Sequence, residues 1–171
     1  QPLDFTKAGI KEAKRELDKF YRAYEELIKI ERQNPESAKR AADDDFVRKD
    51  FLDALRDDLN TPSAISILHT MIYGVFLPGR GSDIGMIMTA MELRQSASLL
   101  GLLQQDPEAW FKWSPAGTAS LDEATIEDLI AKRVEARANK DFALSDRIRD
   151  ELAEQGVILE DGAGGTTWRR E

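Results

Sequence analysis

Arginine, aspartate and phenylalanine side chains gather in the last third of the chain, at a junction between two amphipathic helical segments. Arg137 ends the first segment, residues 139–141 form the junction, and Phe142 opens the second segment. Phe142 and Asp146 are four positions apart and therefore lie on one face of a helix. Asp161 stands in an acidic, Gly-rich turn after a short apolar run, where it could fold back beside them. Side chains this polar and aromatic on a compact hairpin indicate a recognition surface rather than a core.

The same region is locally basic, although the formal net charge of the chain is -8. Basic side chains outnumber acidic ones between residues 132 and 149 (Lys132, Arg133, Arg137, Lys140, Arg147 and Arg149 against Glu135, Asp141 and Asp146). A local positive excess suits the positioning of phosphates. The overall acidity argues against broad, non-specific binding of nucleic acid, which needs a basic face.

Composition excludes several kinds of chemistry. With 171 residues, 42% hydrophobic and 33% charged, the chain fits one globular domain, or one domain with a small appendage. It has no cysteine, so it holds no disulfide, thiol nucleophile or cysteine-ligated zinc. The single histidine, His69, lies beside an apolar stripe and is expected to pack there. The Gly-rich turns 78–81 and 161–165 lack the phosphate-binding pattern, and the runs of carboxylates are typical of solvated faces. We therefore predict no catalytic and no metal-binding residue.

Nothing in the sequence predicts a membrane segment. No uninterrupted apolar run approaches the roughly 20 residues that a membrane span needs. The first four residues contain neither an initiator methionine nor the regions of a signal peptide. We therefore expect a piece of a longer cytoplasmic protein, without a membrane partner.

Four apolar stripes with helical spacing predict a mainly α fold over residues 1–104, an antiparallel helical bundle. The first helix starts after Thr6 and ends at Asn34, before a proline. Residues 36–45 form a linker or a short extra helix, and a second long helix runs from Val47 to Asn60. Thr61 is the expected N-cap of the third helix, with proline at its first position. Ser82 or Asp83 caps the fourth, which ends near residue 103.

A different organisation follows the bundle. Residues 105–121 read as a linker; they contain Trp110, Phe111 and Trp113, of which two are expected to dock on the bundle. Residues 122–171 are predicted to form a small module, a helical hairpin followed by a short β-hairpin. Trp168 is expected in its core, packing the terminal strand on the second helix.

Several motifs carry a resemblance to a known family. Residues 57–62, DDLNTP, resemble a D-D-x-N-T-P motif that joins two bundle helices, and LLGLL at 99–103 matches a helix end. Residues 53–56 are DALR, the four letters that also name a class of helical bundle in synthetases. The strongest signal is C-terminal: AR-x-x-KDFA-x-SD-x-IRDEL, then G-x-x-LEDG, then GTTWRR. In this order, over essentially the whole length, they resemble the C-terminal part of the cysteinyl-tRNA synthetase family, with its class I anticodon-binding bundle.

The resemblance implies a division of labour. The complete enzyme of that family joins cysteine to its tRNA with ATP, on a Rossmann-like catalytic domain that binds zinc. Its HIGH-like and KMSKS-like signatures and its zinc-ligating cysteines do not occur here. We therefore expect no catalysis and no cofactor in this chain, with ATP and zinc belonging to the parent enzyme. The implied partners are cysteine tRNA and the catalytic domain of the same protein.

On the family pattern, Arg137, Asp146 and Asp161 match positions that contact the anticodon, and Phe142 matches an aromatic that is often Trp. Unstacked anticodon bases offer their edges to hydrogen bonds and their faces to stacking. A phenyl ring can stack but has no indole N–H, so a hydrogen bond by that group is in doubt. Contacts to the tRNA backbone are expected from four further cations (Arg133, Lys140, Arg169 and Arg170).

Simpler interpretations of the same residues remain open. Phe142 can be a buried contact of the hairpin, Asp146 can pair with Arg149 or Lys140, and Asp161 can be only a turn former. Residues 129–152 also resemble the helical hairpin of excision-repair nuclease subunits, which indicates a protein-interaction module as the alternative function. That hairpin has no LEDG turn and no GTTWRR segment after it, whereas both occur here.

Overall fold

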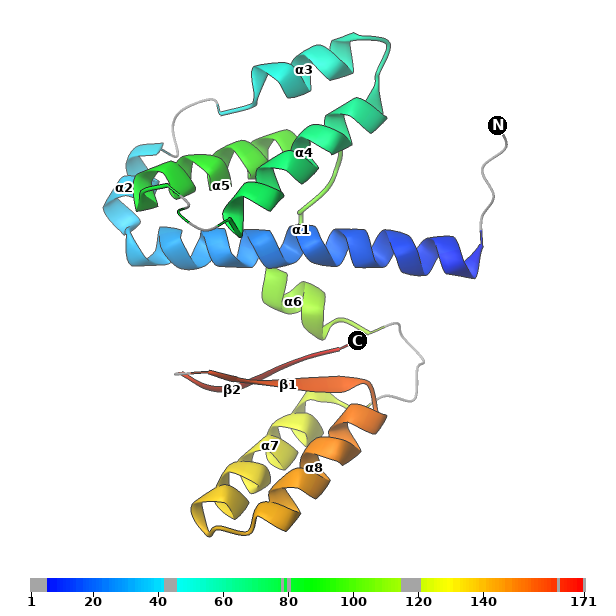
Figure 1. The fold of residues 1–171 in the computed structure, drawn as a ribbon, viewed down its shortest axis with the longest axis vertical. Helices are drawn as coiled ribbons and strands as arrows, with labels where there is room; N and C mark the ends of the chain where they lie inside the picture. The colour runs from blue at the N-terminus through cyan, green and yellow to red at the C-terminus, as the bar shows by residue number, and fades with distance from the viewer. Residues whose placement is uncertain are drawn as a thin grey trace. The chain divides into compact units, whose positions relative to one another are not determined.

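The computed structural model describes residues 6–41, 46–77, 79, 81–114, 121–162 and 164–170. Contacts divide the chain into two compact units, Gln1–Pro107 and Glu108–Glu171. Both are mainly helical, and the second also contains a two-stranded antiparallel sheet (Figure 1). The predicted mainly α fold with a C-terminal β-hairpin is confirmed.

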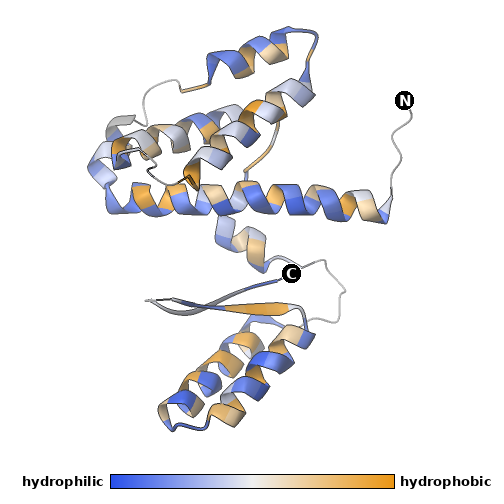
Figure 2. Cartoon of the chain, viewed as in Figure 1, coloured by the Kyte–Doolittle hydropathy of each residue, from blue (hydrophilic) through white to orange (hydrophobic). Residues whose placement is uncertain are grey.

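The first unit is organised along the long helix α1 (Lys7–Gln33). Thr6 caps it by accepting a hydrogen bond from the Gly9 amide at 3.0 Å, and it ends at Asn34 because a proline follows. Figure 2 shows hydrophobic positions recurring between hydrophilic ones along this helix. Its buried residues lie in the second half of the helix (Phe20, Tyr21, Ala23, Tyr24, Leu27 and Ile30). The short helix α2 (Pro35–Ala41) follows directly.

Three further helices complete this unit: α3 (Lys49–Arg56), α4 (Thr61–Val75) and α5 (Asp83–Ser98). Helices α4 and α5 pack against α1, and α3 packs against α4. Burial of their apolar faces drives this packing. Helices α1, α3, α4 and α5 each contribute fully buried side chains (among them Leu27, Phe51, Leu68, Ile87 and Leu93). His69 packs its ring 4.7 Å from that of Phe20, as expected of a packing residue.

The connection between α3 and α4 differs from the sequence-based expectation. Helix α3 ends at Arg56 instead of continuing to Asn60, because Asp58 and Leu59 adopt φ of 52° and 54°. Leu59 is consequently 73% exposed. The N-cap of α4 is Asn60, whose side chain accepts a hydrogen bond from the Ser63 amide at 3.2 Å. Thr61, the expected cap, is instead the first residue of the helix. At the next helix, Ser82 is the cap.

The second unit contains helices α7 (Glu123–Ala138) and α8 (Phe142–Glu154) and strands β1 (Val157–Gly162) and β2 (Gly165–Arg170). The strands pair antiparallel from Val157↔Arg170 to Gly162↔Gly165. Asp141 caps α8 by accepting from the Leu144 amide at 3.0 Å. Gly156 allows the left-handed turn into β1, with φ of 72°. Apolar residues of both helices and both strands share one core (Ile126, Ile130, Ile148, Leu152, Val157 and Trp168).

The expected linker contains a short helix, α6 (Pro107–Lys112). Trp110 and Phe111 lie in this helix, and Trp113 follows it. The docking of two of these aromatics on the bundle stays a prediction, and residues 115–120 lie outside the described part. Among the described residues, no helix is both long and apolar enough to cross a membrane.

Candidate functional site

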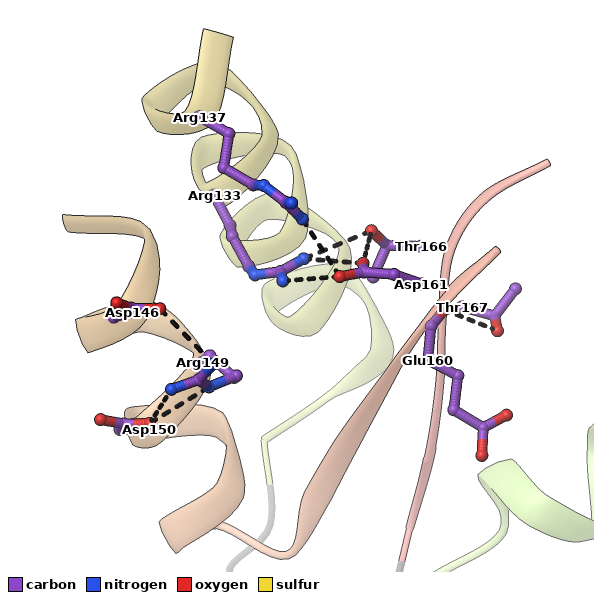
Figure 3. A network of polar contacts seen from close by, with 9 residues as sticks. All are labelled: Arg133, Arg137, Asp146, Arg149, Asp150, Glu160, Asp161, Thr166 and Thr167. Atoms are coloured by element: carbon purple, nitrogen blue, oxygen red, sulfur yellow. Dashed lines mark hydrogen bonds and ion pairs between the residues drawn. The ribbon is translucent and has the colours of Figure 1, made fainter. Parts of the chain in front are cut away.

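A polar cluster joins α7 to the β-hairpin in the second unit (Figure 3). Arg133 and Arg137 are one helical turn apart on α7, so their side chains project from the same face. Asp161 on β1 is paired with Thr166 on β2 in the strand register. All four side chains meet, and we call them the Asp161 cluster. Asp161 therefore lies in a strand beside the turn, not in the turn where the sequence placed it.

Arg133 holds Asp161 with both arms of its guanidinium. Its Nη1 donates to Asp161 Oδ1 and its Nη2 donates to Oδ2, each at 2.9 Å. The Arg133 side chain is only 7% exposed. Its Nε is buried and has no hydrogen-bond partner among the described residues. Burial of a guanidinium costs free energy unless a counter-ion faces it. Asp161 is the counter-ion that offsets this cost for Arg133.

The Asp161 carboxylate is fully engaged. Besides the two bonds from Arg133, Oδ1 accepts from the Thr166 hydroxyl at 2.7 Å, and Oδ2 accepts from Arg137 Nη1 at 3.1 Å. A carboxylate has about four acceptor positions, and these contacts occupy them. The Arg133 hydrogen bonds, followed by that of Thr166, hold the pKa of Asp161 well below its usual value. Asp161 is therefore ionised throughout the neutral range.

Arg137 is the open member of the cluster. Its side chain is 51% exposed, and only Nη1 is bonded among the described residues, to Asp161. The remaining donors of the planar fork have no hydrogen-bond partner among the described residues, while Nη1 is held by Asp161. Such an edge can donate to a planar acceptor edge of a ligand.

The other two predicted anticodon contacts lie on α8. Phe142 is the first residue of the helix and 61% exposed, so it is not a buried contact of the hairpin. Asp146 is exposed one turn later, and its Oδ1 lies 3.5 Å from Arg149 Nη1. This is one of the two ion pairs considered from the sequence. Arg137, Phe142 and Asp146 thus stand near the junction of α7 and α8, and of these only Arg137 contacts Asp161.

The four side chains predicted to contact the tRNA backbone fall into two groups. Lys140 is exposed at the helix junction and forms no ion pair within the described part of the chain. Arg133, Arg169 and Arg170 are instead engaged within the fold. Arg169 pairs with Glu160 across the strands, and Arg170 donates to the carbonyls of Lys112 and Leu121 at 3.1 and 2.6 Å. Phosphate contacts by these three arginines stay a prediction.

Trp168 has the structural position expected of it. Its ring is buried, and its indole N–H donates to Glu127 at 2.6 Å. Lys112 Nζ and Arg170 Cζ lie 5.0 and 5.4 Å from the ring centroid, within the range of cation–π contacts. Sequence reasoning missed Thr166 and the partnership of Arg133 with Asp161. The spacing of Arg133 and Arg137 on one helix face was the signal that could have suggested a shared partner.

The described residues offer no set of side chains for a metal ion. They contain no cluster of three His, Asp or Glu side chains that could hold a metal ion, and the sequence contains no cysteine.

Comparison with known proteins gives this geometry its context. Residues 122–169 match the family model of the cysteinyl-tRNA ligase anticodon binding domain, and residues 50–104 match the DALR domain. A cysteine–tRNA ligase from Rhodospirillum centenum is 48% identical over 170 residues, which are 99% of this chain. The chain belongs to the cysteinyl-tRNA ligase family. The resemblance inferred from its motifs is confirmed.

The match to this family covers a defined part of the relatives. Cysteine–tRNA ligases from Paramagnetospirillum magneticum and Alkalilimnicola ehrlichii are 45% and 42% identical, each across 99% of this chain. The chain spans about a third of the length of these relatives (34% for the Rhodospirillum centenum protein and 35% for the other two). The Asp161 cluster lies inside the region matched by the anticodon-binding model.

Proposed function

We propose that this chain is the tRNA-holding part of a cysteine–tRNA ligase, and that its module 122–171 reads the anticodon of cysteine tRNA. The observation that carries the proposal is the open donor edge of Arg137, tethered at 3.1 Å to Asp161 within the matched region. Supporting it are Phe142 and Asp146, both exposed near the same helix junction.

Each side chain offers a distinct chemistry to an unstacked base. The free donors of Arg137 suit the acceptor edge of a purine, and the Asp146 carboxylate can accept from an exocyclic amine. The exposed ring of Phe142 provides a stacking platform, which contributes about 1–3 kcal/mol per base in proteins that bind single strands. Lys140 adds a cation for a neighbouring phosphate. Together these groups suit single-stranded loop bases better than a duplex.

The proposal extends to the longer enzyme. We infer that a catalytic part uses ATP and binds zinc, that it acts on the tRNA held by this chain, and that the assembly works in the cytoplasm. The support is that the relatives named above are cysteine–tRNA ligases. The described residues do not fit the zinc, because they contain no group of three His, Asp or Glu side chains that could hold it and the chain has no cysteine. We therefore expect the 171-residue chain to bind tRNA without attaching cysteine to it.

Binding of the 171-residue chain to two tRNAs tests the proposal. Gel-shift titrations at a stated salt concentration compare cysteine tRNA, with its GCA anticodon, against the same tRNA with the first anticodon base changed. We expect at least about tenfold tighter binding of the unchanged tRNA. Arg137→Ala should lose most of this preference. Lys132→Ala removes a cation from the opposite face of the same helix, where it pairs with Asp128, and should keep it.

Equal binding of the two tRNAs by the wild-type chain contradicts anticodon reading. No tRNA binding at all would favour the alternative, a helical protein-interaction module. The match of residues 122–169 to an anticodon-binding family argues for the first function over the second.

A further inference from the structure

Arg133 is placed for a different task from its neighbour Arg137. Both arginines lie on one face of α7 and both bond Asp161, yet their side chains are 7% and 51% exposed. The described partners of the Arg133 guanidinium are Asp161 and, at 3.4 Å, the Thr166 hydroxyl. A ligand approaching from solvent therefore meets Arg137, while Arg133 stands behind it.

We propose that Arg133, together with Thr166, is a positioning residue for anticodon reading: it clamps the Asp161 carboxylate, which in turn sets the place of Arg137. The inference rests on the function proposed above. It assigns Arg133 a part in specificity without a contact to tRNA.

The clamp acts by restricting the conformations of the Arg137 side chain. A bidentate pair restrains both the position and the plane of a carboxylate, and the Thr166 hydroxyl at 2.7 Å adds a further contact to Oδ1. One corner of Arg137 is then tied to an acceptor that cannot move. Ordering the long arginine side chain before binding reduces the entropy lost when a base is bound, and it favours the base whose edge fits that position.

The clamp also decides how much of Asp161 a base can use. Oδ1 accepts from Arg133 and Thr166, which are both held by the fold, whereas Oδ2 is shared by Arg133 and the exposed Arg137. Only the position taken by Arg137 can be exchanged without breaking the clamp. A base can therefore be read by the free donors of Arg137, or by Oδ2 after Arg137 has turned toward the base.

A phosphate contact by Arg133 would leave a different signature. Each lost phosphate contact weakens binding of all sequences and reduces the salt dependence of binding by about one unit of slope. Loss of a positioning residue weakens discrimination instead and leaves the salt slope unchanged. The salt slope and the ratio of the two dissociation constants can be measured in the same titrations.

The test uses the 171-residue chain with four variants and the two tRNAs that differ at the first anticodon base. Arg133→Met removes the clamp, and Arg133→Lys keeps its charge without the planar fork. Thr166→Val removes the hydrogen bond that the hydroxyl donates to Asp161 and the one that it accepts from Arg133, without exposing a charge. Lys132→Met is the matched control, because it removes a cation from the neighbouring position on α7, where the side chain is exposed. Gel shift is run over a series of salt concentrations, and circular-dichroism melts report folding.

We expect Arg133→Met to reduce the ratio of the two dissociation constants by about tenfold, with the salt slope of the wild type. Thr166→Val and Arg133→Lys should reduce the ratio by a few fold at a near wild-type melt, and these two variants decide the matter if Arg133→Met does not fold. Lys132→Met should leave the ratio unchanged.

Two outcomes would overturn this inference and leave the proposed function standing. One is wild-type discrimination in both Arg133→Lys and Thr166→Val. The other is an equal loss of affinity for both tRNAs in Arg133→Met, together with a smaller salt slope. A wild-type chain that does not discriminate would remove the proposed function, and this role with it.

Discussion

Arg133 and Asp161 form an unequal pair, in which a buried guanidinium faces a half-exposed carboxylate through two hydrogen bonds of 2.9 Å. The side chains are 7% and 48% exposed. Water can hydrate Asp161 when its partner is lost, but it has little access to Arg133. Substitutions of the two residues are therefore not equivalent, and the consequences for stability, pH dependence and recognition can be separated.

Replacement of Asp161 by Ala should destabilise the second unit. The change leaves the Arg133 charge buried without a counter-ion, which costs about 3–5 kcal/mol in a fully buried pair. Because Asp161 is half exposed, we expect about 1–3 kcal/mol, measured by urea unfolding. Asp146→Ala is the control: that side chain is exposed and its pair with Arg149 is 3.5 Å long, so the change should stay within about 0.5 kcal/mol. An Asp161→Ala variant as stable as the control would contradict this account.

The Asp161 cluster should also make stability depend on acidity. Asp161 has a pKa below its usual 3.8 in the folded state, so it stabilises the fold above that value and ceases to do so as the pH falls through the folded pKa. The free-energy difference between the wild type and Asp161→Asn should be constant above about pH 5 and shrink steadily toward pH 2. Thermal melts of both proteins at each pH check this. A difference that does not change over that range would show that Asp161 is not held by the arginines in solution.

Phe142 should matter for tRNA and not for the fold. Its ring is 61% exposed, so Phe142→Ala should change stability by less than about 0.5 kcal/mol. Stacking contributes about 1–3 kcal/mol per base, and tRNA binding in gel shift should weaken accordingly, while Phe142→Trp should retain it. Leu144→Ala, at another exposed apolar position of α8, serves as the control. Unchanged tRNA binding by Phe142→Ala would exclude a stacking role.

The cap of α4 provides a test in the first unit. Asn60→Ala removes the acceptor of the Ser63 amide and should cost about 1 kcal/mol in urea unfolding. Thr61→Ala changes the neighbouring residue, which is already inside the helix, and should have little effect. The opposite ranking would restore Thr61 as the cap.

Local chemistry explains which elements could be predicted. The ends of α1 at Asn34 and of α8 before Gly156 follow from proline and glycine at those places. Two neighbouring residues that both favour a cap, Asn60 and Thr61, could not be ranked by type, because the choice depends on where the chain leaves α3. The left-handed conformations of Asp58 and Leu59 decide it. Helix α6 was missed because six residues are too few to show a period.

By itself, the sequence determined the family, the helical units and the places of Arg137, Phe142 and Asp146 around the helix junction, whereas the exposure of Phe142 came from the structure. These follow from motif order and from spacings of a few residues along one helix. Only the tertiary structure decided that Arg133 is buried, that it holds Asp161 from 28 positions away, and that Arg169 and Arg170 are engaged inside the fold. The contacts of Arg133 and Arg170 join segments distant in sequence, and the pair of Arg169 with Glu160 depends on how the two strands are paired. The type of a side chain determines which hydrogen bonds it can form, and the packing of the chain determines the partner.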